Sequence, residues 1–107
     1  MVDSKLSSVL EELSTGLKSV YGERLVQVLL YGSQARGEAT PESDIDVLVI
    51  LAGPVDPLLE ISATERLVAD ISLRNDTVLS CLFLGVEEFD NQTDLFLRNI
   101  RQDAISV

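Results

Sequence analysis

The chain has no histidine and no tryptophan among its 107 residues, and it has a single cysteine. The absence of histidine excludes Ser-His-Asp hydrolysis, histidine-ligated zinc and acid–base catalysis by imidazole. Because Cys81 stands alone, the sequence also excludes a disulfide framework within the chain and a zinc site built from cysteines. The chemistry left to the chain is that of carboxylates and of metal ions that prefer oxygen ligands.

Basic residues are scarce as well. The chain carries 8 lysines and arginines against 18 aspartates and glutamates, which gives a formal net charge of −10. A general nucleic-acid binder needs a basic footprint, so the charge argues against that class and suits a partner with a basic surface. No apolar run reaches the ~18–20 residues of a membrane span, and the first residues, Met1 to Lys5, carry no signal-peptide pattern. We therefore expect a cytoplasmic protein.

Apolar residues make up 46% of the chain, and their spacing predicts alternating helices and strands. A chain of this length forms one domain, so we expect residues 1–107 to share a single core. The order of elements predicts an α/β (α+β) fold, in which a three-stranded mixed sheet has helices packed mainly on one face. The expected elements are a helix over 5–20, strands over 25–31 and 43–51, a helix over 57–73, a strand over 77–84, a helical turn over 86–89 and a last helix over 95–102.

Each of the two long helices carries an apolar stripe at three- and four-residue spacing. The strand over 25–31 is almost unbroken in its apolar character, which predicts burial on both faces. The side chains predicted to face the core are Leu6, Val9, Leu10, Leu13, Leu17 and Val20 on the first helix, and Leu58, Ile61, Leu67, Val68 and Ile71 on the second.

The most informative stretch joins the first two strands. Gly32-Ser33 follows the first strand, and after ten further residues Asp44 and Asp46 begin the second. Side chains two residues apart on a strand share a face, so these two carboxylates would lie roughly 6–7 Å apart along it, close enough to hold a divalent metal. The Gly-Ser turn offers backbone N–H groups and a hydroxyl, which suit a phosphate.

Arg36 follows this turn closely, and two interpretations of it remain open. A guanidinium matches phosphate or carboxylate groups in a fork, which favours a ligand contact. The alternative is an ion pair with Glu38 or Glu42 that holds the loop together.

The spacing of Gly32-Ser33 and Asp44-x-Asp46 resembles the signature of the DNA polymerase beta-like nucleotidyltransferase superfamily. The fuller pattern, over residues 32–37 and 43–46, is similar to that of its minimal nucleotidyltransferase (MNT) branch. This resemblance implies the small nucleotidyltransferase fold. It implies that Gly32 and Ser33 contact the phosphates of ATP, and that Asp44 and Asp46 are catalytic residues that bind Mg²⁺.

The resemblance also implies an activity and a partner. The implied reaction is Mg²⁺-dependent transfer of a nucleoside monophosphate, AMP from ATP, to a hydroxyl of a partner protein. Members of this branch are commonly paired with a HEPN-domain toxin, so the resemblance implies an antitoxin that acts on such a partner.

The chain departs from the family pattern at a third carboxylate, which active members carry on the following strand. Ser80 stands where that acid is expected, and Asp76 lies at the mouth of the same strand. Glu87 and Glu88 are further candidates, although acids at the start of a helical turn are more typically solvated.

Two other functions remain open. One is a nucleotide-binding module of low or no activity that neutralises its partner by contact, which the missing third acid favours. The other is transfer to a small molecule such as an aminoglycoside, although the chain has no room for a separate acceptor-binding domain. The sequence leaves the base preference, the acceptor and the oligomeric state open.

Overall fold

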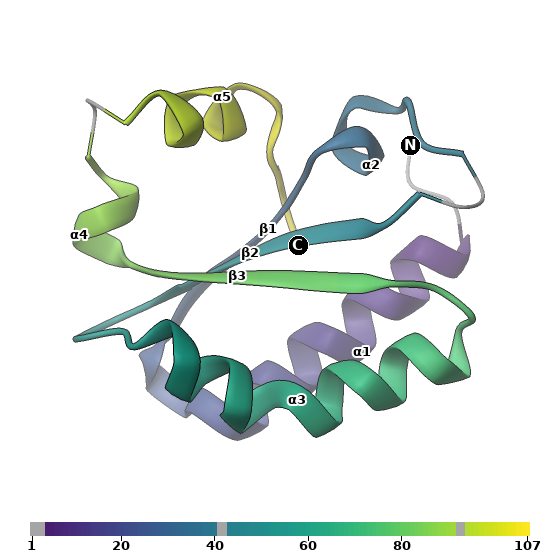
Figure 1. The fold of residues 1–107 in the computed structure, drawn as a ribbon, viewed down its shortest axis with the longest axis horizontal. Helices are drawn as coiled ribbons and strands as arrows, with labels where there is room; N and C mark the ends of the chain where they lie inside the picture. Colours follow the sequence, from purple (N-terminus) through teal and green to yellow (C-terminus); the bar gives the residue numbers. More distant parts are fainter. Residues whose placement is uncertain (1–3, 41–42, 92–93) are drawn as a thin grey trace.

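The computed structural model describes residues 4–40, 43–91 and 94–107, which fold as a mixed sheet with helices packed against it (Figure 1). In chain order the elements are α1 (Ser4–Tyr21), a short 3-10 helix (Gly22–Arg24), β1 (Leu25–Tyr31), α2 (Ser33–Arg36), β2 (Ile45–Leu51), α3 (Pro57–Arg74), β3 (Leu79–Gly85), α4 (Val86–Phe89), α5 (Leu95–Asp103) and β4 (Ile105–Ser106).

The strands lie in the order β3-β2-β1-β4. Strands β1 and β2 are antiparallel, and β3 returns through α3 to pair with β2 in parallel. Strand β4 adds two residues to the free edge of β1 in antiparallel pairing. The sequence predicted three strands, and the fourth escaped prediction because a two-residue strand has too few side chains to show alternation.

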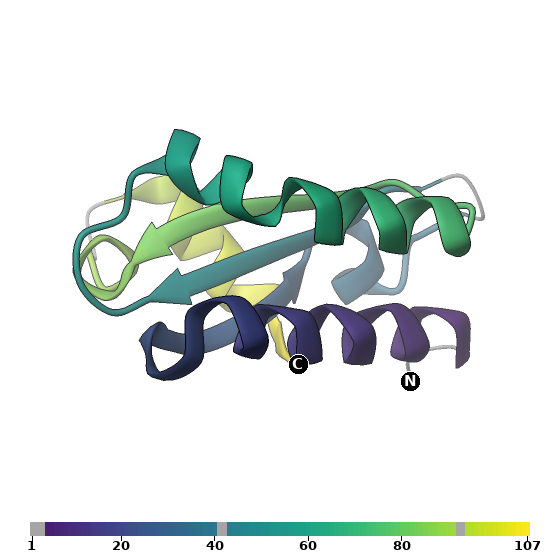
Figure 2. The ribbon, with the colours of Figure 1, turned by 90° about the horizontal axis from the view of Figure 1, so that it is seen from below.

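Two apolar cores lie on opposite faces of the sheet. Helices α1 and α3 cover one face side by side, as Figure 2 shows, over Val47, Val49 and their neighbours. Helix α5 covers part of the other face, where Leu97 and Ile100 pack on Leu48 and Ile50. The alternation predicted for the second strand is therefore confirmed, and Asp46 lies on the same face of β2 as Leu48 and Ile50, which α5 covers.

Helices α1 and α3 are amphipathic, but their buried faces differ in part from the predicted stripes. Val20, Leu58 and Ile61 are exposed rather than buried, and Leu58 is 79% exposed. The buried positions near the start of α3 are instead Glu60 and Thr64. No helix within the described part of the chain is both long and apolar enough to cross a membrane.

The polar side chains take these positions because their hydrogen bonds are satisfied. The Tyr21 hydroxyl donates to Glu60 Oε1 over 3.0 Å, and the Asp56 N–H donates to Glu60 Oε2 over 3.3 Å. The Thr64 hydroxyl donates to the Glu60 carbonyl over 2.8 Å. A buried polar group with such partners avoids the cost of desolvation, so it can replace an apolar side chain.

Strand β1 is buried only over its second half. Val28, Leu29 and Leu30 are buried, whereas Val26 and Gln27 are exposed. The prediction of burial on both faces is therefore wrong for the first half, because Val26 lies in a bulge without a pairing partner on β2 and α5 packs only on the second half of the strand.

Candidate active site

The residues that the sequence singled out gather at one end of the sheet. Tyr31, the last residue of β1, pairs with Asp46 on β2. Gly32 comes next and precedes α2, whose first residue is Ser33. The antiparallel pairing of β1 and β2 therefore brings the Gly-Ser turn beside the two acids.

Gly32 lies in close contact with Asp46. Its backbone has φ +75° and ψ −155°, a conformation that is almost confined to glycine. A Cβ atom at this position would lie 2.6 Å from Asp46 Oδ2, so any side chain here would have to displace the Asp46 carboxylate. Glycine is thus required here by both its backbone angle and the approach of the carboxylate.

Asp46 stands between two neighbours in the sheet, Tyr31 on β1 and Ser80 on β3, on the α5 face. Partial burial raises the pKa of the Asp46 carboxyl, and the negative charge of Asp44 raises it further. Asp44 precedes β2 and is exposed. The two carboxylates therefore repel each other, and a cation between them would relieve the repulsion.

A comparison with known families identifies the family of the chain. The profile of the nucleotidyltransferase domain family matches residues 10–103, which include the Gly-Ser turn and both acids. The chain belongs to this family.

Among its relatives in sequence is the Methanocaldococcus jannaschii protein named "Putative protein adenylyltransferase MJ0604". The present chain and the archaeal protein are 33% identical over 96 residues, which span 89% of the present chain and 90% of the archaeal one.

Two solved structures share the fold. A chain of a toxin–antitoxin complex with AMP-PNP superposes with a TM-score of 0.65 and 17% identity, over 90% of the present chain and 69% of the other. A chain from the complex of a tri-AMPylated Shewanella oneidensis HEPN toxin with its MNT antitoxin gives a TM-score of 0.56 and 15% identity, over 94% and 69%.

The donor set of this nucleotidyltransferase fits a magnesium ion. Mg²⁺ prefers oxygen ligands and is commonly bound by one or two carboxylates together with the phosphates of a substrate. Asp44 and Asp46 provide two such carboxylates, and the pKa of Asp46 is raised first by burial and then by repulsion from Asp44, which a divalent cation would offset. The residues that would hold the ion are therefore these two acids.

Ser33 and Arg36 differ in their availability to a ligand. The Ser33 hydroxyl has no hydrogen-bond partner among the described residues, although its carbonyl accepts the Glu38 N–H. Arg36 Nε forms an ion pair with Glu38 Oε1 at 2.7 Å on the surface, which raises the pKa of the guanidinium. Of the two interpretations of Arg36, the structure contains the ion pair with Glu38, while Glu42 lies outside the described residues.

In the described residues, no third acid lies with Asp44 and Asp46 to complete a group of three metal ligands. Residues 4–40, 43–91 and 94–107 contain no group of three or more Cys, Asp or Glu side chains placed to hold a metal ion. Ser80 lies in register with Asp46 on the neighbouring strand, so it occupies the position where a third acid would complete the group.

The other candidate acids do not complete the group. Asp76 lies at the same end of the sheet as the two acids, because Leu79 pairs with Ile45, but it is exposed in the turn before β3, with φ +48°. Glu88 caps the far end of β3, where its Oε1 accepts the Gly85 N–H over 3.1 Å, and Glu87 precedes it in the same short helix. Because β3 runs parallel to β2, this end of the sheet is opposite to Asp46.

Tyr31 was not singled out by sequence. Its pKa is raised by burial and then by the charge of Asp46, and its ring meets that of Phe96 edge-on, with centroids 6.4 Å apart. The β1–β2 register identifies Tyr31 as a neighbour of Asp46, and that register is visible only once the strands are paired.

Proposed function

We propose that this nucleotidyltransferase transfers AMP from ATP to a hydroxyl of a partner protein, in a reaction that depends on Mg²⁺. The observation that carries the proposal is the contact between Gly32 and Asp46, because it joins the phosphate-binding turn and the carboxylates into one site. The archaeal relative at 33% identity carries the name "Putative protein adenylyltransferase MJ0604", which supports a protein as the acceptor.

In the proposed reaction the acceptor oxygen attacks the α-phosphorus of ATP, and a new phosphorus–oxygen bond forms. The bond from the α-phosphorus to the bridging oxygen of the β-phosphate breaks, pyrophosphate leaves with the electron pair, and the hydroxyl proton passes to solvent. Gly32 and Ser33 orient the phosphates, and Asp44 and Asp46 hold Mg²⁺. When bound, the ion neutralises the charge that develops on the phosphate oxygens.

We further propose that the partner is a HEPN-domain toxin and that the chain acts as its antitoxin. The support is the shared fold with chains of two toxin–antitoxin complexes, one of which contains an AMPylated HEPN toxin. We take residues 1–107 as a single minimal nucleotidyltransferase domain, to which the partner brings the acceptor hydroxyl. The net charge of −10 suits a partner with a basic surface.

The test uses the purified chain, Mg²⁺ and ATP labelled at the α-phosphate, with and without the protein encoded by the neighbouring reading frame. We expect the label to move to the partner protein and to be lost in Asp46→Asn and in Asp44→Asn. Label at the γ-phosphate should not transfer. Absence of transfer from the α-phosphate, under conditions in which both proteins bind each other, would contradict the proposal.

A stability measurement separates catalysis from folding at the acid pair. Without metal the two carboxylates repel each other, so Asp44→Asn/Asp46→Asn should melt no lower than the wild type. Thermal unfolding followed by circular dichroism in EDTA checks this. A marked fall in melting temperature would show that the acids are structural and would weaken any conclusion from the loss of transfer.

Ser80 favours a second candidate function, which is neutralisation of the partner by contact alone. A serine replaces the acid that would complete the group beside Asp46, so turnover could be lost while binding remains. The two functions differ in one result. Contact alone predicts that Asp46→Asn still neutralises the partner, whereas AMP transfer predicts that it does not.

A further inference from the structure

Strand β3 forms one edge of the sheet, and no strand among the described residues pairs with its outer side. In Figure 1 it lies in front of β2 and β1, with α3 on the lower side of the sheet and α5 on the upper side. Its seven residues pair with β2 without a shift in register, and they include no proline and no charged side chain. Proteins commonly use bulges, prolines and charges to keep an edge strand from pairing, so β3 is an unguarded edge.

The backbone groups of β3 divide between its two sides. The Ile45 N–H donates to the Val78 carbonyl over 2.8 Å, so the even-numbered residues of this segment are the ones that bond to β2. The odd-numbered residues therefore direct their N–H and C=O groups to the outer side. The Leu79 N–H agrees with this division, because it leaves the sheet and donates to Ser72 Oγ of α3 over 3.3 Å.

The outer side is capped at both ends and open between them. Ser72 caps its start, and at its other end the Gly85 N–H donates to Glu88. Between these ends the N–H groups of Cys81 and Phe83 have no acceptor among the described residues. These groups and the carbonyls beside them are free to pair with an added strand.

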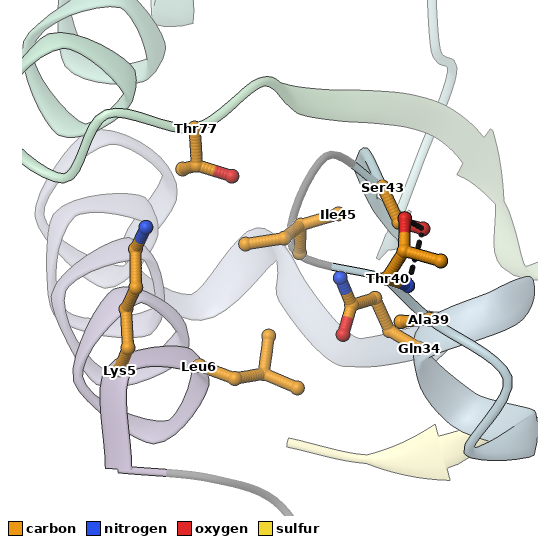
Figure 3. A pocket seen from close by; sticks show the side chains of 8 residues that line it. All are labelled: Lys5, Leu6, Gln34, Ala39, Thr40, Ser43, Ile45 and Thr77. Atoms are coloured by element: carbon orange, nitrogen blue, oxygen red, sulfur yellow. Dashed lines mark hydrogen bonds between the residues drawn. The ribbon is translucent and has the colours of Figure 1, made fainter.

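The segment ahead of β3 faces another feature. Thr77 lines a pocket of about 450 Å³, and Figure 3 shows it opposite Leu6. Ile45 lines the same pocket, and Leu6 and Ile45 belong to the core on the α1/α3 face, across the sheet from Asp46. The open edge therefore begins at β3 itself.

The side of α3 next to this edge is partly apolar. Ser72 marks that side by its bond to β3, and Val68, Glu65 and Ile61 share it because they follow at three- and four-residue spacing. Val68 is half-buried, and Ile61 is 51% exposed. A strand added beside β3 would lie along this side of the helix and bury Ile61.

Three acids lie around the open edge. Asp76 precedes β3, Glu87 follows it, and Glu65 lies on the adjacent side of α3. All three are exposed, and none has an ion-pair partner among the described residues. A segment with basic side chains would match these charges.

The same charges disfavour a second copy of the chain. Two β3 strands related by a two-fold axis would pair antiparallel, which brings Glu87 of one copy toward Asp76 of the other. Each copy also carries a net charge of −10. A partner of opposite charge suits the edge better.

We propose that the edge of β3 binds an extended, basic segment of a partner protein, which adds a fifth strand to the four-stranded sheet. The segment pairs with the backbone of Cys81 and Phe83, its apolar side chains cover Ile61, and its lysines or arginines pair with the three acids. A partner held here lies one strand away from β2, beside the candidate active site. The docking needs no nucleotide, so the inference does not depend on the proposed AMP transfer.

The test uses the full chain labelled with nitrogen-15 and a synthetic probe, the capped heptapeptide Lys-Val-Lys-Val-Lys-Val-Lys. We expect the probe to slow amide exchange at Cys81 and Phe83 by about tenfold or more, as NMR measures it. Exchange at Leu82 should change little, because its N–H already bonds to β2. The same peptide N-methylated at every residue keeps the charge but donates no backbone hydrogen bond, so it should bind more weakly by about tenfold or more.

A pair of protein variants tests the position of the site. Ile61→Lys removes apolar surface beside the edge and adds a charge that repels the probe, so it should weaken binding by about tenfold. Leu59→Lys is the matched control, because Leu59 is also exposed but lies two residues away, on another side of the same helix. We expect this control to bind the probe nearly as the wild type does. Circular dichroism checks that both variants are folded.

Three results would overturn the inference. Equal binding of the N-methylated peptide would show attraction by charge alone, and an equal loss in the two variants would place the probe elsewhere. Slow exchange at Cys81 and Phe83 without the probe, together with a dimer in sedimentation, would show that a second copy occupies the edge. Failure of label transfer from ATP would contradict the proposed function and leave each of these results unchanged.

Discussion

Two glycines flank the short helix α2, and both hold the backbone at positive φ. Gly32 has φ +75° and a conformation nearly confined to glycine, while Gly37 has φ +74° in the ordinary left-handed region. A Cβ atom at Gly37 would meet nothing within 4 Å, whereas at Gly32 it would press on Asp46 Oδ2. Of these two glycines, therefore, only Gly32 has a backbone position that constrains the side chain of Asp46.

This contrast makes a matched pair of variants. Gly32→Ala should abolish nucleotide transfer, because the new methyl group displaces the Asp46 carboxylate, and it should lower the free energy of unfolding by about 1–3 kcal/mol. Gly37→Ala should cost about 1–2 kcal/mol of strain and leave substantial transfer. Transfer assays and urea unfolding check both effects. Equal activity in the two variants would show that the contact with Asp46 does not matter.

Ser80 gives a second prediction at this scale. Ser80→Asp places a carboxylate in register with Asp46, so it should raise the affinity for Mg²⁺ by about tenfold or more and speed transfer. In EDTA the same variant should melt below the wild type, because a third negative charge joins the pair.

Ser80→Asn is the control for that variant, since it has nearly the same size and no charge. Magnesium titrations of the transfer rate and melting curves with and without metal supply the measurements. If Asp and Asn at this position behave alike, Ser80 does not occupy the place of a third acid.

Helix α3 shows what a periodic pattern can and cannot predict at the scale of the element. Its bounds, Pro57–Arg74, agree closely with the predicted 57–73, because Asp56 caps it and Pro57 begins it. Its buried face was predicted in part wrongly, since Glu60 is buried and Leu58 is exposed. The burial of Glu60 depends on Tyr21, which is 39 residues away, and a local pattern carries no such partner.

The same helix allows a test of the corrected face. Ile71→Ala should cost about 2–5 kcal/mol of unfolding free energy, because Ile71 is fully buried against the sheet. Leu58→Ala should cost less than about 0.5 kcal/mol, because the side chain is 79% exposed. Urea denaturation of both variants measures the difference. A similar cost for the two would place Leu58 in a packed environment that the structure lacks.

The candidate site was predictable from sequence to the extent that its parts are local. The Gly-Ser turn and the Asp-x-Asp spacing lie within fifteen residues of chain, so strand alternation and family resemblance were enough to select them. Tyr31 beside Asp46 depends on strand register, and Ser72 beside the edge of β3 depends on how α3 packs on the sheet. Such contacts arise from tertiary structure, which has no signature in adjacent residues.

At the scale of the whole molecule, we expect the free energy of unfolding to fall at high pH. Its net charge of −10 already opposes a compact state, and deprotonation adds to that charge. Burial raises the pKa of the Cys81 thiol from 9.0 to about 12, so the folded chain keeps a proton that the unfolded chain releases. Above the ordinary thiol pKa the unfolded state therefore gains stability relative to the folded state.

From about pH 8 to about pH 10 we expect the free energy of unfolding to fall, with a thiol contribution approaching about 1.4 kcal/mol per pH unit above the ordinary thiol pKa. Cys81→Ala should remove that contribution and show a shallower fall. Urea unfolding at several pH values, for wild type and variant, provides the comparison. Parallel curves for the two proteins would mean that the thiol is ionised equally in both states.

Strand β2 pairs over most of its length along both edges, with β1 on one side and β3 on the other, whereas β1 has only the two-residue β4 along its second edge. Its amide hydrogens should therefore exchange with solvent more slowly than those of the α2 loop, which opens without breaking the sheet. We expect slow amide exchange at Asp46, which lies in β2, and faster amide exchange at Ser33 and Arg36, which lie in α2. Under the proposed function, Asp46 would therefore keep its position while the loop proposed to contact the phosphates opens, so that nucleotide could exchange without displacing this proposed metal ligand.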